Sequence, residues 1–257
     1  LPFYFPIPDP TDEYRTKPTQ LIAHLLGDEG DGSLLAVLRE AGLADGLSAG
    51  VGRGDGNEAL FTVSISLTPA GAERLDDIEA TLFAAIEQIR ADGLAEWRYD
   101  EQKSLSEQAF RFQQHGAPQQ EATRLAMSLS RYPVEDVQYA AYRMDGMDSE
   151  RQQRYLDALT QDNMLRFYSA PDVESDTISP WFNTQWKEQP PTAIGQALSG
   201  LALPEPNPFI ASDLTLQGGQ DEQPTALIET PTFTAWHMQD SRFNTPSVEW
   251  RGGLQHP

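Results

Sequence analysis

The sequence contains no cysteine among its 257 residues. This absence excludes disulfides, thiolate metal sites and a cysteine nucleophile. Long apolar runs are also missing, because no stretch approaches the roughly 20 apolar residues that a membrane helix needs. Residues 1–6 lack the basic region and apolar stretch of a secretory signal, and there is no initiator methionine. We therefore expect a chain that begins inside a longer polypeptide.

Positive charge is scarce as well. The chain has 18 lysine and arginine residues against 39 acidic ones, which gives a formal net charge of -21. An acidic field of that size repels phosphate backbones and anionic lipid, so we expect neither nucleic acid nor a membrane as partner. It attracts a basic or amine-terminated peptide, although solubility is the commoner reason for an acidic composition.

Local catalytic and metal-binding motifs are missing too. The four histidines, His24, His115, His237 and His256, include no pair three to five residues apart, so no helical pair is available for zinc. There is no Gly-x-Ser-x-Gly sequence, and sequence alone joins no serine, histidine and aspartate in space. We therefore assign no catalytic residue, metal ligand or cofactor to this chain.

The patterns that are present predict an α+β fold. Apolar residues at positions 61, 63, 65 and 67 alternate with polar ones, which predicts a half-buried strand, and residues 47–51 and 164–169 are also expected to be strands. The proline-rich residues 3–8 suit an edge strand paired on one side. Helical spacing predicts helices over residues 20–26, from 33, from 69 to 89 as one long helix, and over 100–112, 119–131, 133–142 and 148–159. We expect a mixed, mainly antiparallel sheet with these helices packed on one face.

The composition changes from Pro180 onward, where ten of the nineteen prolines lie. We predict an extended tail there, with Trp181, Phe182 and Trp186 anchoring its beginning on the domain. Residues 217–224 are predicted to be a flexible linker.

Several segments together resemble the second domain of the pitrilysin/insulinase family of zinc peptidases, the inverzincins. They are residues 12–18, 24–35, 67–71, 110–112 and 203–210, and residues 236–246 resemble the entry into the third domain. The resemblance implies four related α+β domains, with the fold of the mitochondrial processing peptidase, in two halves that enclose a chamber. It also implies a noncatalytic domain over residues 1–212, followed by an inter-half linker and the start of the next domain over 213–257.

The family carries its zinc on the inverted motif His-x-x-Glu-His of the first domain. Here His24-Leu25-Leu26-Gly27-Asp28 resembles a degenerate copy, with Gly27 in place of the catalytic glutamate and Asp28 in place of the second histidine. No residue there can take a proton from zinc-bound water, even if Glu107 supplied a third ligand. We therefore expect this chain alone to be no enzyme, and zinc to belong to the first domain of a parent zinc metalloendopeptidase.

The resemblance further implies an exosite for the N-terminus of a peptide or small-protein substrate. The matching positions are His24, Asp28, Leu47, Ser48, Ala49, Gly50 and Val51. An exposed strand edge would supply backbone hydrogen bonds, and a nearby carboxylate would favour the ammonium group. A covered edge with structural glycines is the alternative for this segment.

Two functions of the chain stay open. The chain is either a noncatalytic wall of the substrate chamber or a purely structural scaffold that contacts the other domains of its polypeptide without peptide affinity. A self-contained hydrolase with a nonlocal site is disfavoured by the missing motifs. Because bacterial relatives are often periplasmic, we expect a periplasmic location.

Overall fold

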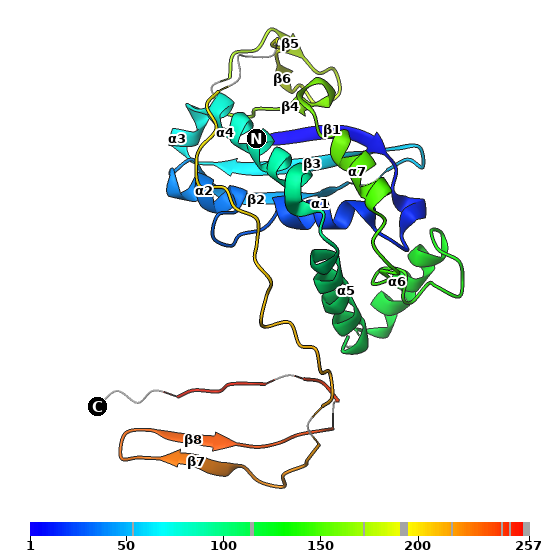
Figure 1. Cartoon of the computed structure of the whole chain (residues 1–257), viewed down its shortest axis with the longest axis vertical. Coiled ribbons are helices and arrows are strands. Elements are labelled where there is room, and N and C mark those ends of the chain that lie inside the picture. The colour runs from blue at the N-terminus through cyan, green and yellow to red at the C-terminus, as the bar shows by residue number, and fades with distance from the viewer. Residues whose placement is uncertain are drawn as a thin grey trace.

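The computed structural model describes residues 1–52, 54–113, 116–171, 173–190, 195–216, 218–242, 244–246 and 248–253. Its centre is a four-stranded sheet in the order β2-β3-β1-β4 (Figure 1). The strands are β1 (Pro2–Pro8), β2 (Ala44–Val51), β3 (Glu58–Leu67) and β4 (Leu165–Arg166). Each pairing in this sheet is antiparallel. The predicted α+β fold is confirmed, although the strand expected over residues 164–169 is only two residues long.

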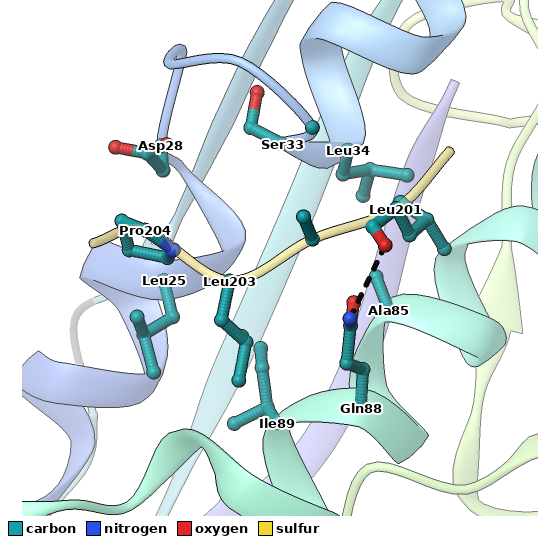
Figure 2. A pocket seen from close by; sticks show the side chains of 12 residues that line it. Leu25, Asp28, Ser33, Leu34, Ala85, Gln88, Ile89, Leu201, Leu203 and Pro204 are labelled. Atoms are coloured by element: carbon teal, nitrogen blue, oxygen red, sulfur yellow. Dashed lines mark hydrogen bonds between the residues drawn. The ribbon is translucent and has the colours of Figure 1, made fainter.

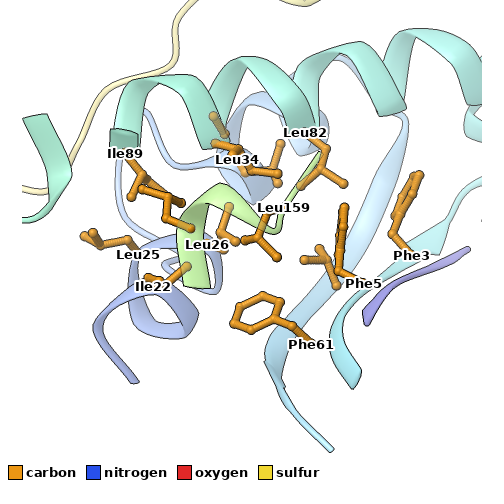
Figure 3. Packing of buried hydrophobic residues seen from close by; sticks show 14 of the residues in the cluster. Phe3, Phe5, Ile22, Leu25, Leu26, Leu34, Phe61, Leu82, Ile89 and Leu159 are labelled. Atoms are coloured by element: carbon orange, nitrogen blue, oxygen red, sulfur yellow. The ribbon is translucent and has the colours of Figure 1, made fainter. Parts of the chain in front are cut away.

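One face of the sheet forms the core. In β3 the apolar residues of the alternating pattern are buried, and the polar ones between them are exposed or half-buried. The helices on the buried face are α1 (Pro18–Leu26), α2 (Leu34–Glu40), α4 (Leu75–Gln88) and α7 (Ser149–Asp157). Figure 3 shows leucine and isoleucine side chains of α1, α2 and α4, together with Ile89 and Leu159, around Phe3, Phe5 and Phe61 of the strands. The prediction of helices on one face is therefore confirmed.

The proline-rich segment forms β1, which lies inside the sheet and not at the predicted edge. Leu1 and Ile65 exchange backbone hydrogen bonds of 2.9 and 3.1 Å, so the odd-numbered residues of β1 bond to β3. Pro2, Pro6 and Pro8, which lack an N–H, fall on the other side. There β1 pairs with β4 over two residues only, so its pairing is nearly one-sided, as predicted.

The long helix predicted after Thr68 is two helices, α3 (Pro69–Ala72) and α4. Thr68 caps α3 as expected, because its hydroxyl accepts the N–H of Gly71 at 3.0 Å. A Cβ on Gly71 would lie 2.0 Å from the carbonyl oxygen of Leu43, so α3 is pressed against the chain before β2. The chain then leaves helical geometry at Arg74, with φ -133° and ψ 40°, before α4 begins.

The helices α5 (Glu96–Arg111) and α6 (Pro118–Leu129) agree with prediction, but residues 133–142 form turns and not a helix. Asp136 accounts for the difference. Its carboxylate accepts the Tyr14 hydroxyl at 2.6 Å and guanidinium groups of Arg143 and Arg15 at 2.6 and 3.2 Å. These contacts tie the segment to the turn η1 (Thr11–Glu13), and the Tyr14 hydrogen bond lowers the pKa of Asp136. The other short helices are η2 (Ile89–Gly93), which is a π-helix, and η3 (Gln161–Asn163).

The tail contains two small hairpins, β5 (Thr177–Ile178) with β6 (Gln185–Trp186) and β7 (Thr225–Glu229) with β8 (Thr234–His237). The predicted aromatic anchor is wrong, because Trp181 and Phe182 are 87% and 86% exposed and Trp186 is exposed as well. Within the predicted linker, Asp221 exchanges hydrogen bonds with Gln239, which follows β8. Gln217, part of that linker, lies outside the described residues.

None of the helices in the described part of the chain is both long and apolar enough to cross a membrane.

Candidate functional site

The predicted site residues lie at the end of α1 and in β2. Leu21, Ile22, Leu25 and Leu26 bury one side of α1, whereas His24 is exposed and Asp28 is half-buried. Asp28 lies two residues after Leu26, the last residue of α1, and it lines the same pocket as His24. We call these two neighbouring residues at the end of α1 the His24 stripe.

Gly27 ends α1 and brings this stripe next to β2. Its N–H donates to the carbonyl of Ala23 at 2.9 Å. A Cβ on Gly27 would lie 3.7 Å from the backbone nitrogen of Ala49. Because Gly27 lies about 60° from His24 around the helix, the strand and the His24 stripe are neighbours. The structure thus brings together the two segments that the resemblance assigned to one exosite.

The strand β2 is an edge of the sheet. The N–H of Gly52 donates to the carbonyl of Leu60 at 2.9 Å, which fixes which residues bond to β3. By alternation, the N–H and C=O groups of Leu47, Ala49 and Val51 point away from β3. No strand of the described part of the chain pairs on that side of β2.

The side chains of β2 contribute little to this edge. Those of Leu47, Ala49 and Val51 pack against the core, and Ser48 is exposed on the opposite face. A Cβ on Gly50 would meet nothing within 4 Å, so close packing does not require glycine there. What β2 offers is therefore its backbone.

A pocket of about 120 Å³ lies on the other side of the His24 stripe. We call it the α1–α5 pocket, because its walls are the end of α1, the first half of α5 and a returning segment of the tail. It is lined by His24, Leu25, Asp28, Trp97, Arg98, Glu101, Gln102, Leu105, Pro204, Glu205, Asn207 and Ile210. The site is thus a stripe of α1 with the β2 edge on one flank and a pocket on the other.

The returning segment, residues 195–210, is hereafter the strap. Figure 2 shows Leu201, Leu203 and Pro204 of the strap crossing from Leu34 to Asp28. The Gln88 amide donates to the Leu201 carbonyl at 3.2 Å, and the Arg98 guanidinium donates to that of Pro204 at 3.2 Å. These bonds hold the strap against α4 and α5.

The beginning of the strap is fixed by α4. The Asp77 carboxylate accepts the N–H of Gln196 at 2.8 Å, and the Thr81 hydroxyl accepts that of Leu198 at 3.1 Å. The Gln196 hydrogen bond, followed by that from Arg74, lowers the pKa of Asp77. The strap is therefore a bound segment of the domain and not a free tail.

Comparison with known families identifies the chain. The model described as "Peptidase M16 inactive domain" matches residues 1–106, and "Middle or third domain of peptidase_M16" matches residues 110–257. The chain belongs to the M16 peptidase family. The resemblance to pitrilysin and insulinase is thereby confirmed, while the predicted division at residue 212 stays a prediction.

Named M16 relatives are much longer than this chain. It is 31% identical to the Arabidopsis thaliana "Insulin-degrading enzyme-like 1, peroxisomal", over 95% of this chain and 26% of the relative. It is also 31% identical to the Homo sapiens insulin-degrading enzyme, over 91% of this chain and 24% of the relative. The crystal structure of pitrilysin superposes with a TM-score of 0.84 at 23% identity, over 95% of this chain and 27% of that one, which shows the fold. The chain thus spans about a quarter of the length of these relatives.

The zinc implied for the parent M16 protein does not fit the corresponding positions of this chain. Gly27 has no side chain to act as a base, and Asp28 Oδ2 accepts the N–H of Gly30 at 3.0 Å. Within the described residues, no group of three histidine, aspartate or glutamate side chains is arranged to hold a metal. Glu101, and not Glu107, is the glutamate of α5 that lines the pocket.

The outer walls of the pocket were not predicted from the sequence. Trp97 and Arg98 were placed before α5, which was expected to begin at residue 100 and begins at Glu96. Glu205 lies in a segment that carries the family resemblance, and this was the available signal for it. Of the four histidines, His24 is in α1 and His237 is in β8. His115 and His256 lie outside the described residues.

Proposed function

We propose that this chain is a noncatalytic part of an M16 zinc endopeptidase and that it holds extended peptides along the edge of β2. The observation that carries the proposal is the set of outward backbone groups of Leu47, Ala49 and Val51 beside the end of α1. An extended peptide can pair with such an edge through main-chain hydrogen bonds, whatever its sequence. Relatives named for degrading insulin fit this substrate class, since insulin is a polypeptide.

The strength of such pairing can be bounded. A net hydrogen bond contributes about 1 kcal/mol, and three outward-facing residues offer roughly four to six bonds to a partner strand. Because binding also costs the freedom of the peptide, we expect dissociation constants on the order of millimolar from the edge alone. Tighter binding needs a second contact. In the exosite hypothesis, His24 and Asp28 make this contact with the ammonium terminus of the peptide.

Zinc and hydrolysis belong, in this proposal, to the first domain of the parent protein. That domain, together with the other domains of the same polypeptide, is the expected partner of this chain. A periplasmic location remains our expectation from bacterial relatives.

A purely structural scaffold is the competing function, and one observation favours it. Trp181 and Phe182 lie almost fully exposed at the turn between β5 and β6, as aromatic side chains do at contacts with other domains. The two functions differ in peptide affinity. A scaffold binds its neighbouring domains and no peptide.

Isothermal titration of the chain with an unfolded peptide, with a free or an acetylated N-terminus, tests the proposal. We expect weak binding of the free peptide and at least tenfold weaker binding of the acetylated one. Equal binding of both would remove His24 and Asp28 from the exosite but leave the strand edge. No binding of either peptide would leave only the scaffold.

A further inference from the structure

The α1–α5 pocket carries an excess of negative charge. Three of its lining residues are carboxylates, Asp28, Glu101 and Glu205, against the single guanidinium of Arg98. The Arg98 head group is engaged by the carbonyls of Asp92, Gly93 and Pro204, at 2.8, 3.4 and 3.2 Å. Within the described residues these acceptors hold Arg98 and no ion pair joins it to the three carboxylates, so the excess of negative charge remains.

Each carboxylate has acceptor capacity left. Asp28 accepts the N–H of Gly30 through Oδ2, and Glu101 accepts the N–H of Asn207 at 3.0 Å through Oε1. Glu205 is exposed, and the described residues offer it neither a hydrogen bond nor an ion pair. A cation that enters the pocket would therefore find oxygen acceptors on α1, α5 and the strap.

The size and remaining lining of the pocket suit one long basic side chain. Its volume of about 120 Å³ corresponds to roughly four water molecules and is well below the roughly 300–1,000 Å³ of drug-sized ligand sites. Leu25, Leu105 and Ile210 supply apolar surface beside the carboxylates. Lysine and arginine bury their methylene stems on such surface while the charged head meets oxygen.

We propose that the α1–α5 pocket binds the side chain of a lysine or arginine near the N-terminus of the peptide held on β2. This inference rests on the proposed function and adds a charge preference to it. The peptide would lie along β2, cross the His24 stripe and place its basic side chain between Asp28, Glu101 and Glu205. An acidic side chain would be repelled by the same three carboxylates.

The test is a set of peptides that differ at one position. A single lysine is placed at the first, second or third residue of an otherwise neutral extended peptide with a free N-terminus, and norleucine and glutamate replace it as uncharged and acidic controls. Dissociation constants for the 257-residue chain are measured by isothermal titration at low and high salt. We expect lysine at one position to bind about five- to tenfold tighter than norleucine, and glutamate to bind more weakly than norleucine.

Two protein variants locate the effect. Glu205→Gln and Asp28→Asn should each reduce the preference for lysine over norleucine at least twofold. Glu222→Gln, an exposed residue beyond the strap that changes the net charge equally, should leave the preference intact. Among the described residues Glu205 has no hydrogen-bond or ion-pair partner, so we expect its variant to keep the thermal stability of the unsubstituted chain.

The outcomes separate the two proposals. If the norleucine peptide binds and lysine gives no gain at any of the three positions, the pocket assignment is overturned while the edge function stands. A lysine preference that Glu205→Gln, Asp28→Asn and Glu222→Gln all reduce equally would also overturn it, because attraction to the net charge of the chain explains that result. No binding of any peptide would remove both proposals.

Discussion

A Cβ atom on Gly32 would lie only 2.6 Å from the Cβ of Ala202, so the strap crosses the α1–α2 loop at a point that admits no side chain. The N–H of Ala202 also donates to the Gly32 carbonyl at 2.8 Å. Gly32 has φ +76°, a conformation that disfavours any residue with a Cβ. Glycine is therefore needed at this position for two separate reasons, of which only the close contact with Ala202 depends on the strap being in place.

Gly32→Ala should release the strap. The left-handed backbone costs alanine about 1 kcal/mol whether or not the strap is docked. The overlap with Ala202 acts on the docked strap alone, so we expect a loss of about 1–3 kcal/mol in strap docking. Amide hydrogen exchange at Gln196, Leu198 and Ala202 measures this loss. Gly42→Ala is the matched control, because Gly42 also has positive φ, at +68°, but has open space around its Cβ position. Equal effects of the two variants would contradict the close contact.

Lys17 should make stability depend on pH. Burial lowers its pKa from 10.5 to about 8, so between pH 8 and 10.5 the unfolded chain binds more protons at this residue than the folded chain does. The contribution of Lys17 to the free energy of unfolding therefore rises with pH across that window. Since the side chain is partly solvated, we expect a gain of about 1–2 kcal/mol and not the full value of the shift.

The Lys17→Met variant isolates this contribution. The free energies of unfolding of both proteins are measured in urea at pH 7.5 and 10. The variant should exceed the unsubstituted chain by more at pH 7.5 than at pH 10. Tyr99, whose pKa burial raises to about 12, titrates in both proteins and cancels in the difference. A margin that does not change with pH would mean that Lys17 has an ordinary pKa in the folded chain.

Local signals in the sequence were sufficient for the elements around the site. Ser33 caps α2 through its hydroxyl at 3.1 Å from the N–H of Ala36, and Thr68 caps α3. Alternation predicted β3, and the strand expected over residues 47–51 is the second part of β2. The degenerate motif located His24 and Asp28 at the end of α1. Such signals lie within a few residues of the feature they predict, so the sequence displays them directly.

Features set by distant contacts were missed. The periodic apolar pattern runs through Arg74 without a break, because the contact of Gly71 with Leu43 that separates α3 from α4 is tertiary. The turns around Asp136 depend on Tyr14, 122 residues earlier. Glu205 reaches the pocket only because the strap returns across α4, and tail composition gave no hint of that path.

Gln152 should be replaceable by methionine with a gain in stability. The residue is fully buried in α7, and neither atom of its amide has a hydrogen-bond partner among the described residues. An unsatisfied buried amide costs about 1–3 kcal/mol, whereas methionine has a similar shape and no such need. We expect Gln152→Met to raise the unfolding free energy by about 1 kcal/mol in urea. A clear loss would show that the amide has a partner, such as a buried water.

Zinc titration should show no stoichiometric binding to this chain. The degenerate motif offers only two ligands, His24 and Asp28, and among the described residues no group of three histidine, aspartate or glutamate side chains could complete a site. In calorimetry we expect zinc to give only its heat of dilution, both with the unsubstituted chain and with the His24→Ala variant. Tight binding of one zinc that His24→Ala abolishes would show that His24 and Asp28 do take part in a metal site.

Val51→Pro should weaken peptide binding without loosening the sheet. The N–H of Val51 points away from β3, so proline removes a donor from the open edge and leaves the β2–β3 ladder intact. We expect several-fold weaker binding in calorimetry and a melting temperature that falls much less than in the control below, because proline gives up only part of the packing of the Val51 side chain. Gly50→Pro is the matched control: the N–H of Gly50 faces β3, so this variant should lose about 3 kcal/mol of stability. Full peptide affinity in a folded Val51→Pro chain would exclude the β2 edge as the binding surface.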